Sequence, residues 1–536
     1  MGSFMATVAD VIIEELQDAG VRTLFGVPGG AGNLDLIDAA GRVGLRFVLT
    51  ATETAAAIAA VAEAEVTGQL GACLTTLGPG AASAANGIAC AFLERAPVLV
   101  FSDSHSAATF EHQRIDQAAL FGSITNASLR LAPDNARTTM REARQRARSP
   151  RPGPVHIGCP GDVCSAEVSG TENDVGNLFP EKRFPTSFSV GPETKTTFSE
   201  ARRPLLVVGV GARRPEDAAA IRSLCERFRI PAMVTYKAKG VVPDDHPWFA
   251  GVFTNGSIEQ PLMDEADLLI GVGLDPVELL PRPWAHKQAI VYAGPWTVEN
   301  KHVPFSEQFV GPISEYLADI ETNLGTSSWD AAAVRAFVTG QRKAVSIETA
   351  GLSAQRVVEL AAACFAATTR VTVDAGAHML PATMLWPVST PNDMLISNGL
   401  STMGFALPAA IGAATADPSR AVVALTGDGG LLMCTGELLT AVREKLRIVV
   451  IVFNDASLSL IEIKQQARQL PAAGVALGAM DWCALAAGFG VRPFAATNED
   501  EFARALESAG NCEGPSLIEA KIDRSNYGAT LRAIRG

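Results

Sequence analysis

Aromatic and charged residues are both scarce in this chain of 536 residues. Aromatic residues make up 6% of it, with only four Tyr, and charged residues make up 19%, against about 25% in ordinary globular proteins. So few tyrosines argue against a surface on which nucleic-acid bases stack. The formal net charge of −13 also has the wrong sign for a protein that neutralises phosphates. We therefore expect no nucleic-acid partner.

Long hydrophobic runs and paired cysteines are missing as well. Apolar runs such as 448–453 fall far short of the roughly 18 to 20 residues of a membrane span. The N-terminus carries Asp10, Glu14 and Glu15 instead of a basic segment followed by an apolar core, so no signal peptide is expected. The nine Cys are scattered, odd in number and without a Cys-x-x-Cys pair, as in reduced cytoplasmic proteins. These absences predict a cytoplasmic protein that does not associate with membranes.

Short apolar segments alternate with helical patterns along the whole chain. The predicted strands begin at Thr23, Phe47, Gly71 and Val98, at Leu205, Ala232 and Asp267, and at Arg370, Val422 and Ile448. Nearly continuous apolar strands separated by helices are typical of parallel sheets covered on both faces. Two stretches read as linkers: 165–203, which is polar, and 322–353, which is mixed and partly helical. The sequence thus predicts an α/β protein of three doubly wound parallel-sheet domains, at 1–165, 190–325 and 350–536.

A glycine-rich turn with two acidic residues follows neighbouring predicted strands of the third domain. The unit runs through strand 422–426, Gly427-Asp428-Gly429-Gly430, a predicted helix at 435–445, strand 448–453 and Asn454-Asp455. Glycines let backbone amides approach a phosphate, and a helix start favours negative charge. Asp428 and Asp455 leave adjacent strand ends, where two carboxylates can hold Mg²⁺ that also takes phosphate oxygens. Either Asp alone is better explained as a helix-capping turn residue, whereas the complete unit favours a diphosphate cofactor.

This unit resembles the signature of thiamine diphosphate (ThDP) enzymes: acetolactate synthases, pyruvate oxidases, 2-keto-acid decarboxylases and benzaldehyde lyases. The resemblance extends over the whole chain, in a form most like the acetolactate synthase large subunit. The segments that carry it are Phe25–Gly30, Thr52-Glu53 with the alanines that follow, Thr76–Gly80, 153–162 and Asn398–Gly404. It implies an N-terminal pyrimidine-binding domain, a Rossmann-like central domain and a C-terminal diphosphate-binding domain.

The resemblance also implies roles for particular residues toward ThDP. Glu53 would be catalytic, since the matching glutamate hydrogen-bonds the cofactor's pyrimidine ring; by itself it could be a first-turn helix charge. Met403 would support the bent cofactor, although it could be ordinary core filler, and the Ser401 carbonyl would accept from its amino group. Diphosphate contacts are implied for Gly427, Asp428, Gly429 and Gly430 and for a second loop, Ala375, Gly376, Ala377 and His378, where His378 could equally be a plain loop histidine. The implied Mg²⁺ ligands are Asp428, Asp455 and the Ser457 carbonyl.

The substrate is less well indicated than the cofactor. Gln113 is retained from the acetolactate-synthase pattern and is predicted as catalytic, next to His112, which replaces Phe. The predicted substrate pocket comprises Gly30, His112, Gln113, Leu460 and Ile461. The resulting function is decarboxylation of a 2-keto acid followed by ligation to a second carbonyl. The alternatives are a decarboxylase or benzaldehyde-lyase-like enzyme that releases an aldehyde, and a flavin-linked oxidoreductase of the pyruvate-oxidase type.

A flavin site and the oligomeric state remain open at this stage. The segment 208–213 (Val-Gly-Val-Gly-Ala-Arg) lacks the full Gly-x-Gly-x-x-Gly of a dinucleotide site, so FAD is possible but not supported. In the family, the glutamate and the metal of one site belong to different subunits. The resemblance therefore implies a homodimer or homotetramer with active sites at the subunit interface.

Overall fold

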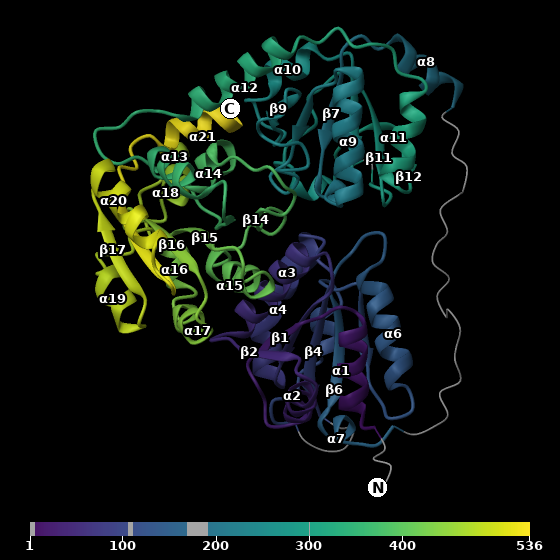
Figure 1. Cartoon of the computed structure of the whole chain (residues 1–536), viewed down its shortest axis with the longest axis vertical. Helices are drawn as coiled ribbons and strands as arrows, with labels where there is room; N and C mark the ends of the chain where they lie inside the picture. Colours follow the sequence, from purple (N-terminus) through teal and green to yellow (C-terminus); the bar gives the residue numbers. More distant parts are fainter. Residues whose placement is uncertain (1–5, 106–110, 169–190, 300) are drawn as a thin grey trace.

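The computed structural model describes residues 6–105, 111–168, 191–299 and 301–536. It contains three six-stranded sheets whose neighbouring strands all run parallel, each flanked by helices (Figure 1). The strand orders are β2-β1-β3-β4-β6-β5, β12-β11-β10-β7-β8-β9 and β14-β13-β15-β16-β18-β17. Each order reverses direction within its sheet, which is the doubly wound topology predicted from the sequence.

The N-terminal domain is built on the first sheet. Its strands are β1 (Thr23–Gly26), β2 (Arg46–Leu49), β3 (Gly71–Thr75), β4 (Val98–Ser104), β5 (Ala127–Arg130) and β6 (Val155–Pro160). Its helices are α1 (Val8–Asp18), α2 (Gly32–Val43), α3 (Glu53–Thr67), α4 (Gly78–Leu93), α5 (Gln117–Phe121), α6 (Ala136–Ala147) and α7 (Gly161–Cys164).

The central domain contains the second sheet. Its strands are β7 (Pro204–Val208), β8 (Ala232–Val234), β9 (Phe249–Val252), β10 (Leu268–Val272), β11 (Ala289–Gly294) and β12 (Phe305–Val310). Its helices are α8 (Pro192–Glu200), α9 (Pro215–Phe228), α10 (Gln260–Glu265) and α11 (Ile313–Glu321), with short 3₁₀ turns η1 (Val210–Ala212) and η2 (Pro276–Glu278).

The C-terminal domain is preceded by a long helix, α12 (Ala331–Val345). Its strands are β13 (Arg370–Val373), β14 (Met394–Ile396), β15 (Val422–Gly427), β16 (Ile448–Asn454), β17 (Arg492–Ala496) and β18 (Ser516–Lys521). Its helices are α13 (Ala354–Phe365), α14 (Met379–Leu385), α15 (Ala406–Ala416), α16 (Asp428–Leu432), α17 (Glu437–Arg443), α18 (Ser459–Ala467), α19 (Trp482–Gly488), α20 (Glu499–Gly510) and α21 (Tyr527–Arg535).

Helices α3 and α15 join the N-terminal and C-terminal domains through small residues (Figure 1). A Cβ added at Gly412 of α15 would lie 2.1 Å from the Ala59 carbonyl oxygen of α3. On its other side α3 meets α4 just as closely, because a Cβ at Gly87 would lie 2.6 Å from the Thr54 carbonyl oxygen. Only glycine allows such approaches, and the alanines around them keep the helices close. Gly412 and Gly87 thus let α3 pack closely on α15 of the C-terminal domain and on α4 of its own domain.

The structure confirms all ten predicted strands, each within one or two residues of its predicted start. The predicted helix at 435–445 is shorter and begins at Glu437, as α17. Eight strands were missed: β5, β6, β9, β11, β12, β14, β17 and β18. Five of them (β5, β9, β12, β14 and β17) lie at sheet edges, and in β5 and β17 partly exposed residues interrupt the apolar pattern. The other three lie next to an edge strand.

Both predicted linkers contain an ordered helix, which was predicted for part of 322–353 but not for 165–203. Helix α8 lies within 165–203 and buries Phe198 in the central core, while residues 169–190 lie outside the described part. Helix α12 lies within 322–353 and places Val334 in the central core and Val345 in the C-terminal core. Phe198 is the one buried residue of α8, which is too weak a periodic signal for detection in sequence, whereas α12 buries Val334, Val338, Gln341 and Val345 at helical spacing. Across the described ranges, none of the helices is long and apolar enough to cross a membrane.

Candidate active site

The glycine turn after β15 is packed against a buried carboxylate at the end of β13. Asp374 accepts hydrogen bonds from Thr426 Oγ1 at 2.8 Å and from the backbone nitrogens of Gly404 and Phe405, each at 3.1 Å. A Cβ added at Gly430 would lie 2.3 Å from Asp374 Oδ2, so this position has room for glycine only. Burial raises the pKa of Asp374 to about 6, although four hydrogen bonds oppose the shift. Asp374 thereby fixes the glycine turn and the loop before α15 to each other.

The two predicted metal ligands meet at the ends of β15 and β16. Asp428 Oδ2 accepts from the backbone nitrogens of Asp455, at 3.2 Å, and Ala456, at 2.7 Å. Asp455 accepts from the Ser457 backbone nitrogen at 3.0 Å and from Ser459 Oγ at 2.6 Å. Burial, followed by repulsion from Asp455, raises the pKa of Asp428 to about 6. A divalent cation would relieve this repulsion, and each carboxylate keeps lone pairs for it.

His378 occupies the gap between the two predicted diphosphate-binding loops. A Cβ added at Gly376 would lie 2.7 Å from its ring, and one added at Gly427 would lie 3.3 Å from it. The ring stacks on Phe453 at 5.0 Å and is 3% exposed, and its Nε2 has no hydrogen-bond partner. Burial lowers the pKa of His378 to about 4, so the imidazole is neutral. A buried ring nitrogen without a partner, beside two glycine turns, fits a bound polar group such as a phosphate.

The remaining cofactor residues of the C-terminal domain line the same edge of the sheet. Ala375 donates its backbone N–H to Asp374 at 3.0 Å, and Ala377 is buried after it. Met403 Cε lies 3.5 Å from the position of a Cβ at Gly429, so its thioether end faces the glycine turn. Ser401 is exposed and has a positive φ of 56°. The strand-end loops thus bring together all the diphosphate residues that the sequence predicted.

Glu53 is the first residue of α3, and the turn before it is held by an acid from the C-terminal domain. Thr52 caps the helix by accepting from the Ala55 backbone nitrogen at 3.2 Å. Glu437, fully buried at the start of α17, accepts from the backbone nitrogens of Ala51 and Thr52, each at 3.0 Å. The sequence analysis missed Glu437, because a glutamate in the first turn of a helix looks ordinary.

The side chain of Glu53 lies over the start of α4. A Cβ added at Gly80 would lie 2.9 Å from Glu53 Oε1 and 2.6 Å from Thr75 Oγ1. At the same helix start, the Gly78 backbone nitrogen donates to the Gln113 carbonyl at 3.1 Å. A Cβ at Gly78 would lie 2.3 Å from that oxygen, and Gln113 itself has a positive φ of 59°. The structure therefore brings Glu53 and Gln113 to one end of α4.

The predicted substrate residues lie on two domains. Gly30 and His112 are exposed on the N-terminal domain, and the His112 carbonyl accepts from His105 Nε2 at 2.7 Å. Leu460 is partly buried on α18 of the C-terminal domain, and Ile461 is 45% exposed there.

Glu462, which the sequence analysis gave no catalytic role, is engaged locally. Its carboxylate binds Ser457 Oγ at 2.9 Å and pairs with Arg524 at 2.6 Å. In the described part of the chain no cluster of three or more His, Cys, Asp or Glu side chains is arranged for a metal ion. A metal at Asp428 and Asp455 would therefore draw further ligands from backbone, cofactor or water oxygens.

Comparison with known proteins agrees with this geometry. Three profiles match the chain: the N-terminal TPP binding domain of thiamine pyrophosphate enzymes at residues 6–120, their central domain at 194–320 and their C-terminal TPP binding domain at 374–520. Acetolactate synthase of Bacillus subtilis (strain 168) is 30% identical over 97% of this chain and 93% of its own length. Acetolactate synthase isozyme 1 large subunit of Escherichia coli (strain K12) is 29% identical over 96% of this chain and 94% of its own length. A probable 2-ketoarginine decarboxylase of Pseudomonas aeruginosa is 29% identical over 96% of this chain and 94% of its own length. The chain belongs to the thiamine pyrophosphate enzyme family.

Proposed function

We propose that this protein is a ThDP- and Mg²⁺-dependent enzyme that makes or breaks a carbon–carbon bond next to a carbonyl. The observation that carries the proposal is the pairing of Asp428 with the turn that bears Asp455, beside a glycine turn that Asp374 fixes. The two carboxylates and the Ser457 carbonyl would hold the metal. The amides of Gly429 and Gly430, with His378 Nε2, would bind the diphosphate.

When bound, ThDP would supply a thiazolium ring that stabilises negative charge at the carbonyl carbon of the substrate. Glu53 would exchange a proton with the pyrimidine ring, as a general acid–base group. Met403, which faces Gly429, would contact and support the cofactor, and the Ser401 carbonyl would accept from its amino group. Gln113, next to the end of α4, would orient the substrate by hydrogen bonds.

We further propose a homodimer or homotetramer in which each site uses Glu53 of one subunit and the metal residues of another. Large apolar side chains near the metal turn support a covered surface: Met433 is 61% exposed after α16 and Leu439 is 50% exposed on α17. Met433 Cβ lies 3.4 Å from the position of a Cβ at Gly404, in the loop that also carries Met403. Apolar side chains this exposed beside a site are typical of a surface that a partner covers.

The reaction we favour is decarboxylation of a small or aromatic 2-keto acid and ligation of the remaining fragment to a second carbonyl. Gln113 and the apolar pair Leu460 and Ile461 support it, as does the similarity to acetolactate synthases. The second candidate is decarboxylation that releases an aldehyde, which the similarity to a probable 2-ketoarginine decarboxylase favours.

One experiment separates these reactions. Purified protein is incubated with ThDP, Mg²⁺ and a panel of 2-keto acids, with and without an aldehyde acceptor, and products are followed by mass spectrometry. An acyloin or acetohydroxy acid is expected from the ligase, and a free aldehyde from the decarboxylase. Reduction of added flavin would indicate the oxidase. Absence of turnover with every keto acid, together with no binding of ThDP, would contradict the proposal.

A further inference from the structure

The turn between β7 and α9 of the central domain begins with the glycine-containing segment 209–212. In dinucleotide-binding folds, the corresponding turn after the first strand offers free amides to a diphosphate. Here the N–H groups of residues 209–212 all have acceptors within the protein. Gly209 donates to Val272 O at 2.9 Å, Val210 to Glu278 Oε2 at 2.8 Å, Gly211 to Gly273 O at 2.9 Å and Ala212 to Gly209 O at 3.0 Å.

Glu278 is the acceptor that takes the place of a phosphate oxygen. Its second oxygen accepts from Thr235 Oγ1, at the end of β8, at 2.6 Å. The residue is 6% exposed, and a Cβ added at Gly209 would lie 2.8 Å from Glu278 Oε2. Burial raises the pKa of Glu278 to about 7, and the hydrogen bonds from Thr235 and Val210 oppose that shift. A carboxylate buried on an amide and a hydroxyl occupies the kind of cradle that anions take.

The glycines of this turn accommodate the neighbouring loop instead of a ligand. A Cβ at Gly209 would lie 2.6 Å from Leu274 Cα, and a Cβ at Gly211 would lie 3.0 Å from Gly273 Cα. The indole of Trp296 lies 3.1 Å from the same position at Gly211. The close approach that glycine permits is therefore already used by the loop after β10.

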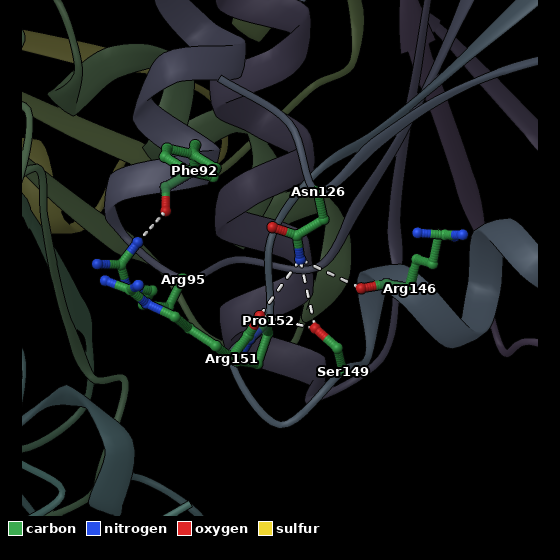
Figure 2. Close-up of a pocket in the computed structure, with 7 residues that line it drawn as sticks. All are labelled: Phe92, Arg95, Asn126, Arg146, Ser149, Arg151 and Pro152. Atoms are coloured by element: carbon green, nitrogen blue, oxygen red, sulfur yellow. Dashed lines mark hydrogen bonds between the residues drawn. The ribbon is translucent and has the colours of Figure 1, made fainter. Parts of the chain in front are cut away.

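A second carboxylate of the same loop neutralises the cations nearby. Asp275, three residues before Glu278, pairs with Arg95 Nε of the N-terminal domain at 2.9 Å, and both side chains are buried. Arg95 also donates to the Phe92 carbonyl at 2.8 Å, and Arg151 lies 3.7 Å from Asp275. Figure 2 shows Arg95 and Arg151 side by side along a cavity of about 350 Å³, with Arg95 turned back to Phe92. Arg95 is thus paired with Asp275, and Arg151 lies near the same carboxylate.

We infer that the Asp275–Glu278 segment fills the diphosphate position of the central domain, so that this domain excludes nucleotides that carry a diphosphate, such as FAD and ADP. The two carboxylates accept from groups that could otherwise bind a diphosphate. Glu278 accepts from the Val210 amide, and Asp275 pairs with Arg95 and lies near Arg151. The same segment links the three domains. Asn398 Nδ2, in the loop that leads to Met403, donates to the Glu278 carbonyl at 2.9 Å, and Arg95 reaches Asp275 from the N-terminal domain. The central domain then holds the N-terminal and C-terminal domains together.

The test uses the full-length protein with ThDP and Mg²⁺ at saturation, so that the metal turn is not available to added anions. With FAD or ADP at about 1 mM, we expect no heat of binding and no change in the unfolding midpoint of the unmodified protein. Glu278→Ala should lower the midpoint by at least about 3 °C, because it leaves two buried donors without an acceptor. Inorganic phosphate should recover part of this loss in Glu278→Ala and leave the unmodified protein unchanged.

The matched control is Glu265→Ala, which removes an exposed glutamate of the same domain, 2.9 Å from Arg203, and should change little. Binding of FAD or ADP by the unmodified protein at one equivalent per chain would overturn the inference. So would a Glu278→Ala variant as stable as the unmodified protein, or a phosphate effect equal in both. If the alanine variant does not fold, Glu278→Gln, which keeps one acceptor oxygen, takes its place in the same comparison. None of these readouts requires turnover, so the inference can fail or hold independently of the proposed reaction.

Discussion

Glu437 Oε1 lies 3.0 Å from the backbone nitrogen of Thr52, so an acid of the C-terminal domain holds the residue that caps the Glu53 helix. Glu437→Ala should leave ThDP binding measurable and lower kcat by about 100-fold, because small displacements of a catalytic group have large effects. Steady-state kinetics and calorimetric titration with ThDP measure the two quantities. Glu444→Ala, in the same segment but paired with Arg46, is the control that should keep kcat. Loss of ThDP binding equal to the loss of kcat would contradict a role in positioning Glu53.

Glu53→Gln should bind ThDP and Mg²⁺ almost normally and lose about 100- to 10,000-fold in kcat, the range of general acid–base catalysis. The amide keeps the size and hydrogen-bonding capacity of the side chain but cannot exchange the proton. Exchange of the cofactor's C2 proton with deuterium, followed by NMR after acid quench, isolates this step from substrate binding. Unchanged exchange and activity would show that Glu53 serves only as a first-turn helix charge.

Gly430→Ala should abolish diphosphate binding and destabilise the C-terminal domain. The added methyl group would lie 2.3 Å from Asp374 Oδ2, and overpacking of this kind costs about 1 to 3 kcal/mol of unfolding free energy. Thermal unfolding with and without ThDP and Mg²⁺ measures both effects. Gly488→Ala, at the end of α19 with nothing within 4 Å of the new Cβ, is the matched control. A Gly430→Ala protein that ThDP stabilises normally would argue against the glycine turn as the diphosphate cradle.

Asp455→Asn and Asp455→Ala should differ in cofactor binding. Repulsion from Asp455 contributes to the raised pKa of Asp428, so the asparagine removes a negative charge and keeps an oxygen ligand. In Asp455→Asn we expect the Kd for ThDP in the presence of Mg²⁺ to rise by no more than about tenfold, which is about 1.4 kcal/mol of binding free energy. In Asp455→Ala we expect ThDP binding to be lost. Titration of ThDP at several Mg²⁺ concentrations tests this, with chelation of Mg²⁺ as the zero point. Equal binding by both variants would place the metal elsewhere.

Glu63, in the middle of α3, predicts a pH dependence of stability. Burial raises its pKa to about 7, partly opposed by a hydrogen bond from Thr23, and its Oε2 has no partner. The folded state therefore binds more protons than the unfolded state between about pH 4.5 and 7, so the Glu63 contribution to stability falls as pH rises through this window. Glu63→Gln should stabilise the protein at pH 8 by up to about 3 kcal/mol and have little effect near pH 4.5.

Glu65, two residues further along α3, is a control, because its substitution is expected to have the opposite effect on stability. Its burial would raise the pKa, but Lys237 and Arg213 outweigh this and lower it. Glu65→Gln leaves the buried Lys237 with only the more distant Glu94, at 3.6 Å, and should destabilise by about 3 kcal/mol at pH 8. Chemical denaturation of both variants at pH 5 and 8 tests the pair. The same sign for the two substitutions at pH 8 would contradict the interpretation.

Local patterns determined the architecture of this protein. Buried parallel strands are apolar on both faces, so β1, β7 and β15 are visible in the sequence without any knowledge of their neighbours. The glycine turn at 427–430 and Asp455 are likewise local, because their roles depend on backbone approach and on leaving adjacent strand ends. Edge strands such as β17, and helix α12, which packs on two cores, depend on partners far along the chain.

The hydrogen bonds and close contacts that hold the site in place depend on the tertiary structure alone. Asp374 is the end of a predicted strand, yet its contact with Gly430 joins residues 56 positions apart, and Glu437 meets Thr52 across 385 positions. Glu278 reads as one more acid in a loop until the fold places its carboxylate on the Val210 amide. A sequence encodes which residues can accept a hydrogen bond, whereas which donor each one meets depends on how the three sheets pack. The kind of chemistry was therefore determined locally, and the positioning of the acids that support it was determined by long-range packing.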